Sequence, residues 1–412
     1  MERRKTRNVP EVQRNISILS WERDHVRASV IQLGEGVAEL IGVAAAPMQG
    51  IGRTAHPDID RWFAGCSAAL TEAEDMTEAA SGHKVVPNYL AMGIPAEIVT
   101  GLPVTIKRPR HAKQEGITQE ELEQALRKSY RSAQDILAAG TTPAALRDGQ
   151  EIISGSLVEI TVDGQVVDDP VGLQGETLEL SVYYCLAPRE WVRALQIVAD
   201  RLETGLTVLV PHQMALALPL PHPVALLIVL DEHHTVVSGV RRGQVEWTSL
   251  VDMGERQMVE ATAAALSLRE RQANALMRVY RARQLHEEAE IQVAAAFWAQ
   301  LRQWMDQLGD AARPHVQDGA VPRQVFFVDD TRHMPEALQS LQTPYWEQRL
   351  PFGCCPDVVE FSLTLVRNVL DCTARAGGAE FLKLRALAHY MARLYAADIS
   401  LERTLAQMIR LR

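Results

Sequence analysis

The sequence is short of three things: cysteine, positive charge and long apolar runs. Its five cysteines among 412 residues are too few and too scattered for a disulfide framework. Cys354 and Cys355 are adjacent, which fits neither a Cys-x-x-Cys redox motif nor a zinc site. We therefore expect a protein of the reducing cytoplasm.

The formal net charge of −10 argues against a general nucleic-acid binder. No apolar run approaches the roughly 18 residues that a membrane-spanning helix needs. Residues 1–15 are basic and lack the apolar segment of a signal peptide, so we expect a disordered tail there. The remaining chain is long enough for about two to three domains, and its 47% hydrophobic content is that of an ordinary globular protein.

In the first half, apolar patterns predict strands that alternate with helices. A helix is expected over 58–80, where apolar side chains recur every three to four residues after an N-cap at Asp58. A second helix is expected from Thr118, where Thr118 and Glu121 have the spacing of a capping box, and a third over 189–202. Strands are expected over 16–19, 26–31, 37–44, 85–94, 98–101, 104–107, 157–162, 178–184 and 206–210.

The second half follows the proline-rich stretch 219–223, which predicts a hinge. A buried apolar run, a polar turn at 231–234, a second branched run and a turn at 241–243 together predict a β-hairpin over 224–248. One further strand is expected at 324–328, and helices over 255–308, 361–370, 381–397 and 401–411. Strands and helices that alternate in two halves predict a two-lobed α/β fold.

Four segments resemble FtsA, a bacterial cell-division family of the actin superfamily. The third segment is the most specific, because it is similar to the family's Asp-Gly and Asn-Pro-Val-Gly-Met run. Together the segments cover about 16–370, and their order and spacing carry the resemblance. They are Ile41-Gly42-Val43 through Asp58-Ile59; Met92-Gly93-Ile94-Pro95 with Ile117-Thr118; Val162-Asp163-Gly164-Gln165 with Asp169-Pro170-Val171-Gly172-Leu173; and the hairpin over 224–248.

The resemblance implies an actin-like, ribonuclease-H-like fold with ATP between two lobes, an FtsA-type inserted subdomain and a mostly helical C-terminal region. In FtsA the insert helps the protein meet neighbouring copies and division partners. The expected divisions are a first lobe over 16–85 and 188–219, an insert over 86–187, a second lobe over 224–371 with a helical small subdomain over 256–310, and a linker with amphipathic helices over 372–412.

The three nucleotide-binding loops that the resemblance implies have lost their glycines and aspartates. The first two positions below replace the Asp and Gly of the first loop. The two valines replace both aspartates of the second loop, whose glycines are replaced by Asp-Glu-His, and the last three replace a glycine cluster. The degenerate positions are Ser20, Glu22, Val229, Asp231, Glu232, His233, Val236, Asp329, Asp330 and Thr331.

These replacements predict that the chain has lost the ability to bind ATP. Side chains at left-handed glycine positions would cost about 1–2 kcal/mol each if the turns kept their shape. Carboxylates would also stand near phosphate oxygens, and two like charges roughly 4 Å apart repel by about 4 kcal/mol at an effective dielectric near 20. We therefore expect no ATPase activity and no bound cofactor. ATP with Mg²⁺ would bind only if the atypical loops proved competent.

Two alternatives for the acidic loops stay open. Asp231, Glu232, Asp329 and Asp330 are either solvated turn residues or oxygen ligands of a divalent cation. The adjacent His233 and His234 invite a metal or acid–base role, but neighbouring side chains on a hairpin point apart. We assign no metal site.

The extreme C-terminus carries an apolar stripe with arginines. Such a helix either lies on an anionic membrane surface, as FtsA-like proteins do, or packs on this protein or a partner. The candidate membrane or partner residues are Leu401, Arg403, Leu405, Met408, Ile409, Arg410, Leu411 and Arg412.

The leading interpretation is a non-catalytic FtsA-like scaffold of bacterial cell division or envelope assembly. It would act through protein contacts and self-association, in the cytoplasm or at the inner face of the cell membrane. The alternatives are an ATP-binding, filament-forming FtsA-type ATPase and a scaffold like PilM of pilus assembly, which shares the insert. FtsZ is a candidate partner, but its site on FtsA cannot be transferred, because 261–308 is almost continuously helical. No nucleic-acid partner is expected.

Overall fold

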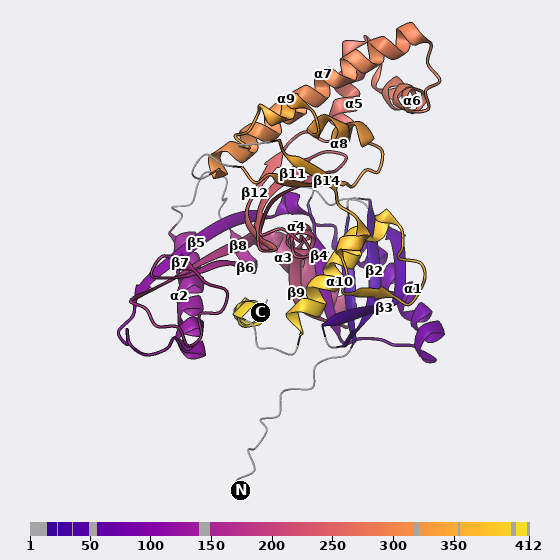
Figure 1. Cartoon of the computed structure of the whole chain (residues 1–412). Coiled ribbons are helices and arrows are strands. Elements are labelled where there is room, and N and C mark those ends of the chain that lie inside the picture. Colours follow the sequence, from indigo (N-terminus) through magenta and orange to yellow (C-terminus); the bar gives the residue numbers. More distant parts are fainter. Residues whose placement is uncertain are drawn as a thin grey trace. The chain divides into compact units, whose positions relative to one another are not determined.

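The computed structural model describes residues 15–22, 24–34, 36–48, 56–139, 149–316, 321–352, 355–396 and 401–409. The chain forms two compact units, whose elements are labelled in Figure 1. Unit 1 is Met1–Pro219 with Leu363–Arg412, and unit 2 is Leu220–Ser362. The chain passes from one unit to the next inside the proline-rich stretch 219–223.

Unit 1 is built on a six-stranded sheet in the order β15-β3-β2-β1-β4-β9. The first three strands of the chain pair antiparallel, β4 and β9 extend the sheet in parallel from β1, and β15 pairs in parallel with β3. Nearly every residue of the central β1 is buried, as branched apolar runs require. The strands are Asn15–Trp21 (β1), His25–Gly34 (β2), Val37–Pro47 (β3), Tyr89–Ile94 (β4), Gly205–Pro211 (β9) and Val369–Asp371 (β15).

Helices cover both faces of this sheet. Side chains alternate along β1, so Ser20 and Trp21 point to opposite faces. Trp21 packs with Trp62 of α1 and Trp62 with Trp191 of α3, while Ser20 bonds to His212 of α4, beside α10. The helices are Ile59–Ser81 (α1), Arg189–Arg201 (α3), His212–Ala217 (α4) and Leu382–Leu394 (α10), and 3₁₀ turns occupy Leu363–Leu365 (η3) and Ala379–Phe381 (η4).

Unit 2 repeats the strand order of unit 1. Its sheet runs β12-β11-β10-β13-β14, with three antiparallel strands first and two parallel strands after. The same succession describes β3-β2-β1-β4-β9 of unit 1. The strands are Val224–Leu230 (β10), Thr235–Arg241 (β11), Gln244–Val251 (β12), Gln324–Asp329 (β13) and Asp357–Glu360 (β14).

The small subdomain of unit 2 is helical, as the sequence indicates. No strand occurs between 252 and 316, a stretch that is described throughout. Phe297, Leu301 and Trp304 of α7 pack into the core beneath the sheet. The helices of unit 2 are Glu255–Ala265 (α5), Glu270–Arg281 (α6), Glu287–Ala312 (α7), Pro335–Leu341 (α8) and Pro344–Glu347 (α9), with a 3₁₀ turn at Arg313–His315 (η2).

An inserted subdomain in unit 1 has its own sheet, in the order β5-β8-β6-β7. Helices α2 and α11 close its core with Leu122, Leu126, Leu405 and Ile409. Its elements are Ala96–Ile98 (η1), Thr100–Pro109 (β5), Gln119–Ala138 (α2), Gln150–Val162 (β6), Gln165–Val166 (β7), Thr177–Pro188 (β8) and Leu401–Met408 (α11).

Three sequence predictions need correction. The insert expected over 86–187 starts too early, because β4 belongs to the six-stranded sheet of unit 1. The helix expected over 361–370 is wrong, because the chain there forms a 3₁₀ turn and the short strand β15. Residues 363–371 belong to unit 1 and not to the second lobe, because β15 pairs with β3. The two helices expected within 372–412 do form, and they belong to unit 1, where α10 packs on the first sheet and α11 on the insert.

Among the helices that the structure describes, none is long and apolar enough to cross a membrane. The tail expected over 1–15 lies outside the described residues except for Asn15, the first residue of β1.

Candidate functional site

The first loop lies at the β1–β2 hairpin, where the sequence has Ser20 and Glu22. Ser20 is fully buried, and its hydroxyl is hydrogen-bonded to Nε2 of His212 at 3.1 Å. Burial, with a smaller contribution from Lys383, holds the pKa of His212 well below its usual value, so the pair is neutral. The Glu22 carboxylate forms an ion pair with Arg27, whose guanidinium lies over the Phe381 ring. Both polar groups of this loop are therefore engaged inside unit 1.

The second loop is the turn between β10 and β11. Its Asp231 carboxylate accepts hydrogen bonds from the backbone N–H groups of His233 at 2.7 Å and His234 at 2.9 Å. These N–H groups lie in the turn that the resemblance assigns to phosphate. They are already satisfied by a side chain of the same turn.

Helix α5 begins directly against this turn. The backbone N–H groups of Glu255 and Arg256 donate to the carbonyl oxygens of Asp231 and Glu232 at 3.0 and 2.8 Å. Gly254 makes the approach close, because a Cβ there would lie 2.5 Å from the Asp231 carbonyl oxygen. These two N–H groups in the first turn of α5 are thus bonded to the loop and not open to a ligand.

The third loop follows β13, and Asp329 organises it. One carboxylate oxygen accepts from the Thr331 backbone N–H, the Thr331 hydroxyl and the Arg332 N–H, at 3.1, 2.6 and 3.0 Å. The other oxygen accepts from the N–H of Met334 at 2.8 Å. Four donors converge on one carboxylate, which closes the loop around its own side chain.

The same arrangement recurs after β15 in unit 1. There Asp371 accepts from the N–H and hydroxyl of Thr373 at 2.9 and 2.6 Å, and from the N–H of Ala376 at 2.8 Å. The two sequences share Asp-x-Thr, and in each the aspartate also accepts from the backbone N–H five residues on, in Met334 and in Ala376. The third loop is therefore built on a turn that this chain also uses elsewhere.

The second and third loops lie side by side. β10 and β13 are parallel neighbours with Leu230 opposite Asp329, and the N–H of Asp330 donates to the carbonyl oxygen of Leu230 at 2.9 Å. Val229 and Val236, the two valines among the predicted loop positions, are paired across β10 and β11 and buried. The structure thus brings eight of the ten predicted loop positions together in unit 2.

The strain expected for these positions is absent. None of the ten loop residues, all of which are described, has a positive φ. The turns are built around side-chain acceptors, so no residue with a Cβ has to stand in a left-handed glycine conformation. Arg332, just after the third loop, has a φ of 62° instead.

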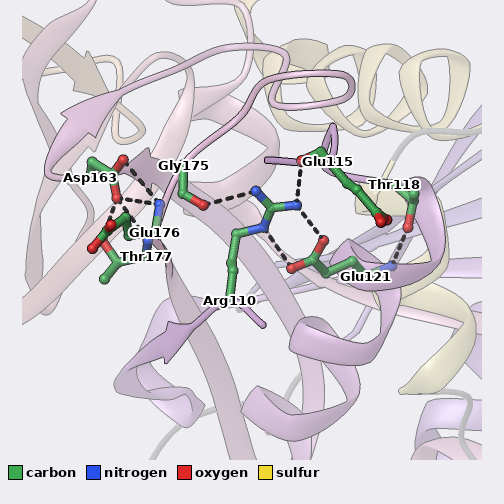
Figure 2. A network of polar contacts seen from close by, with 8 residues as sticks. All are labelled: Arg110, Glu115, Thr118, Glu121, Asp163, Gly175, Glu176 and Thr177. Atoms are coloured by element: carbon green, nitrogen blue, oxygen red, sulfur yellow. Dashed lines mark hydrogen bonds and ion pairs between the residues drawn. The ribbon is translucent and has the colours of Figure 1, made fainter. Parts of the chain in front are cut away.

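A polar network in the insert was not predicted from the sequence. Arg110 is buried and forms a two-pronged ion pair with Glu121, at 2.8 and 3.1 Å, and donates to the carbonyl oxygens of Gly175 and Glu115 (Figure 2). Glu121 therefore bonds Arg110, while Thr118 alone caps α2 by accepting from the Glu121 N–H. The hydrogen bonds from Arg110 lower the pKa of the Glu121 carboxyl below its usual value.

A second part of this network explains the most specific segment of the family resemblance. Asp163, in the left-handed conformation with a φ of 52°, accepts from the N–H groups of Glu176 and Thr177 and from the Thr177 hydroxyl (Figure 2). These bonds tie the β6–β7 turn to the start of β8. The segment is a structural clasp within the insert.

Comparison with known proteins places the fold. No protein-family model matches this sequence, and a comparison with curated proteins finds no match either. Among solved structures, the PilM–PilN type IV pilus biogenesis complex aligns over 93% of this chain and 99% of that one, with a TM-score of 0.58 and 14% identity. The chain has the actin-like ATPase fold. The duplicated strand order of the two units is the architecture of that fold.

Two other solved structures align over most of the chain. One is a Bacteroides thetaiotaomicron protein described as having an actin-like ATPase fold and unknown function, at 6% identity, 93% and 98% coverage and a TM-score of 0.39. The other is the ethanolamine utilization protein EutJ from Carboxydothermus hydrogenoformans, at 10% identity, 89% coverage of both chains and a TM-score of 0.43.

In this actin-like chain, the C-terminal stripe packs on the protein itself. Leu405 and Ile409 are buried against Gly155 of β6, where a Cβ would meet both side chains at 3.2 Å. Leu401 and Met408 pack at the margin of the same core, and Arg403 lies over the Tyr395 ring. The remaining candidates, Arg410, Leu411 and Arg412, lie outside the described residues. The described apolar stripe is therefore occupied by the insert.

Proposed function

We propose that this chain is a protein-binding scaffold of bacterial envelope assembly that works without bound ATP. One observation carries the proposal. In unit 2, the backbone N–H groups of two adjacent loops are taken by carboxylates of the loops themselves, Asp231 and Asp329. Backbone N–H groups at such turns are what an actin-like site offers to phosphate.

The charge of these carboxylates strengthens the argument. A phosphate would have to displace Asp231 or Asp329 from its donors and would then approach the same negative charge. Each displaced carboxylate would lose charge-assisted hydrogen bonds worth about 1.5–3 kcal/mol apiece. The residues of these two loops do not fit a nucleoside triphosphate, and we assign no catalytic step to ATP.

The scaffold role is proposed in the manner of PilM, in preference to FtsA. The similarity to the PilM–PilN complex spans nearly all of both chains, and that complex belongs to type IV pilus biogenesis. The FtsA interpretation would make FtsZ a partner, but in FtsA the FtsZ-binding face lies on a small subdomain that contains a β-sheet. That subdomain is helical here, so the partner we propose is an envelope protein other than FtsZ.

A deletion of the gene in its native host tests this role. We expect the deletion strain to lose a surface structure such as pili, or the secretion of a protein, while its cell length stays normal. Expression of the full chain should restore what was lost. An Asp231→Asn variant, which keeps the side-chain acceptor and removes its charge, should complement equally well. Filamentous cells with intact surface structures would favour the cell-division reading and overturn ours.

A further inference from the structure

Three long antiparallel strands at sheet edges are treated differently in this chain. An edge strand presents N–H and C=O groups on alternate residues, and these groups attract another extended segment unless they are covered or blocked. The three edges are those of β3, β5 and β12. Their comparison identifies an interaction surface.

The edge of β3 is covered by the chain itself. The N–H of Ala38 donates to Asn368 at 3.0 Å, and the carbonyl oxygen of Leu40 accepts from the N–H of Cys372 at 3.0 Å. The short strand β15 thus lies in parallel against β3.

The edge of β5 is blocked by proline. The N–H of Arg110 donates to Glu176 across the β5–β8 ladder, and the register of that pair has no bulge. Alternation therefore turns the backbone groups of 101, 103, 105, 107 and 109 away from β8. Pro103 and Pro109 occupy two of these five outward positions, so the edge lacks the donors that a pairing strand would need.

The edge of β12, which occupies the place of β3 in the strand order of unit 2, has neither protection. The backbone N–H of Asp231 donates to the carbonyl oxygen of His234, at the turn end of the β10–β11 ladder. Alternation from this pair directs the backbone N–H and C=O groups of the even-numbered residues of β11 toward β10. Those of the odd-numbered residues are directed toward β12. Val237 is paired with Ser249, so Thr248 and Leu250 direct their backbone groups outward. Both retain their N–H, and no strand of the described chain pairs with β12 on that side.

Side chains along this edge define what it fits. Glu246 lies at the bulge near the start of β12, and Asp252 lies one residue past its end, so this edge has an acidic residue near each end. Glu246 is held by Arg241 at 3.3 Å, and Asp252, whose side chain is three-quarters exposed, lies 3.9 Å from Nε2 of His234. Trp247 stacks on the His315 ring at 4.5 Å and packs against the core of unit 2, which fixes the strand from its other face.

We propose that β12 receives an extended segment of a partner protein by strand addition, and that this segment carries basic side chains on either side of an apolar residue. The acids at both ends favour basic side chains directly opposite them. They disfavour a second copy, whose own β12 would bring the same two acids. β15 on β3 shows that this sheet architecture accepts such a strand at the equivalent edge.

The test uses the full chain and a displayed library of random heptapeptides. We expect enrichment of peptides with lysine or arginine flanking an apolar residue. Thr248→Pro removes one outward N–H and should weaken an enriched peptide at least tenfold, whereas Thr248→Val, which removes only the hydroxyl bonded to Ser238, should retain binding. Leu250→Pro and Leu250→Ala form a second matched pair, and circular dichroism verifies that all four variants fold.

Hydrogen exchange supplies a direct readout. The enriched peptide should slow exchange at the amides of Thr248 and Leu250. The proposal is overturned if no such peptide is enriched, or if binding survives both proline variants. It is also overturned if sedimentation shows self-association that Thr248→Pro abolishes, since the occupant is then a second copy. The proposal rests on the scaffold function only in requiring a protein partner, and ATP binding by the chain would refute that function without altering these outcomes.

Discussion

The Ser20 hydroxyl and Nε2 of His212 lie 3.1 Å apart, with both residues buried in unit 1. His212 also lies against Gly93 of β4, where no Cβ fits because Leu387 and His212 fill the space. A position that carries a metal-organising aspartate in the FtsA resemblance thus belongs to a neutral, close-packed contact between β1 and α4.

This contact predicts that acid destabilises the protein. Burial lowers the folded-state pKa of His212 below the unfolded value, so the unfolded state binds more protons once the pH falls below about 6.5. The stabilisation is fully present above that pH and declines as pH falls. Urea unfolding at pH 7 and pH 5 should show a smaller difference for His212→Gln than for the native chain. The exposed His111→Gln variant is the control, and an unchanged pH difference in His212→Gln would contradict this account.

The repeated Asp-x-Thr turn predicts matched losses in the two units. Asp329→Ala and Asp371→Ala each leave several donors without an acceptor, and each should lower the free energy of unfolding by about 1–3 kcal/mol. Asp60→Ala, which removes an exposed ion pair with Arg201, should cost less than about 1 kcal/mol. A loss confined to Asp371→Ala would show that Asp329 is free to serve a ligand.

The packing of α11 on the insert predicts that its apolar stripe stabilises the fold. Leu405→Ala should cost about 2–5 kcal/mol, because the side chain is fully buried. Gly155→Val should also destabilise, since its side chain would collide with Leu405 and Ile409. Removal of residues 399–412 should leave sedimentation with anionic liposomes unchanged. Liposome binding that depends on those residues would restore the membrane-anchor interpretation.

The Arg110 network predicts a difference between arginine and lysine. Arg110→Lys retains the charge but loses the planar fork that bonds Glu121 and two carbonyl oxygens, so unfolding of the chain should become easier by about 1–3 kcal/mol. Lys113→Arg, at an exposed ion pair with Glu176, is the control and should change little. Equal stability of both variants would show that the fork is dispensable.

Much of the fold could be predicted, because it depends on local patterns. The buried strands 224–230 and 236–240 are apolar runs bounded by polar turns, and Asp58 and Thr118 both cap helices where their spacing indicates. The helix predicted over 361–370 failed for the opposite reason. Its apolar residues have helical spacing, but β15 is held by pairing with β3, a contact between segments far apart in sequence.

The candidate site was predicted in its position but not in its chemistry. The sequence shows that glycines are absent from the loops, yet it cannot show that Asp231 and Asp329 turn back onto their own backbone. The partner of the C-terminal stripe was hidden for a similar reason, since the Gly155 groove that receives Leu405 is formed only when the insert folds. Arg110 gave no signal at all, because its partners, Glu115, Glu121 and Gly175, come together only when the insert folds.

Equilibrium dialysis of the full chain against labelled ATP with Mg²⁺ tests the central claim most directly. We expect no binding up to millimolar ATP for the native chain. An Asp231→Gly, Asp329→Gly double variant tests whether these carboxylates are the cause, since it both releases the N–H groups and removes the two negative charges. Saturable micromolar binding by the native chain would contradict the account.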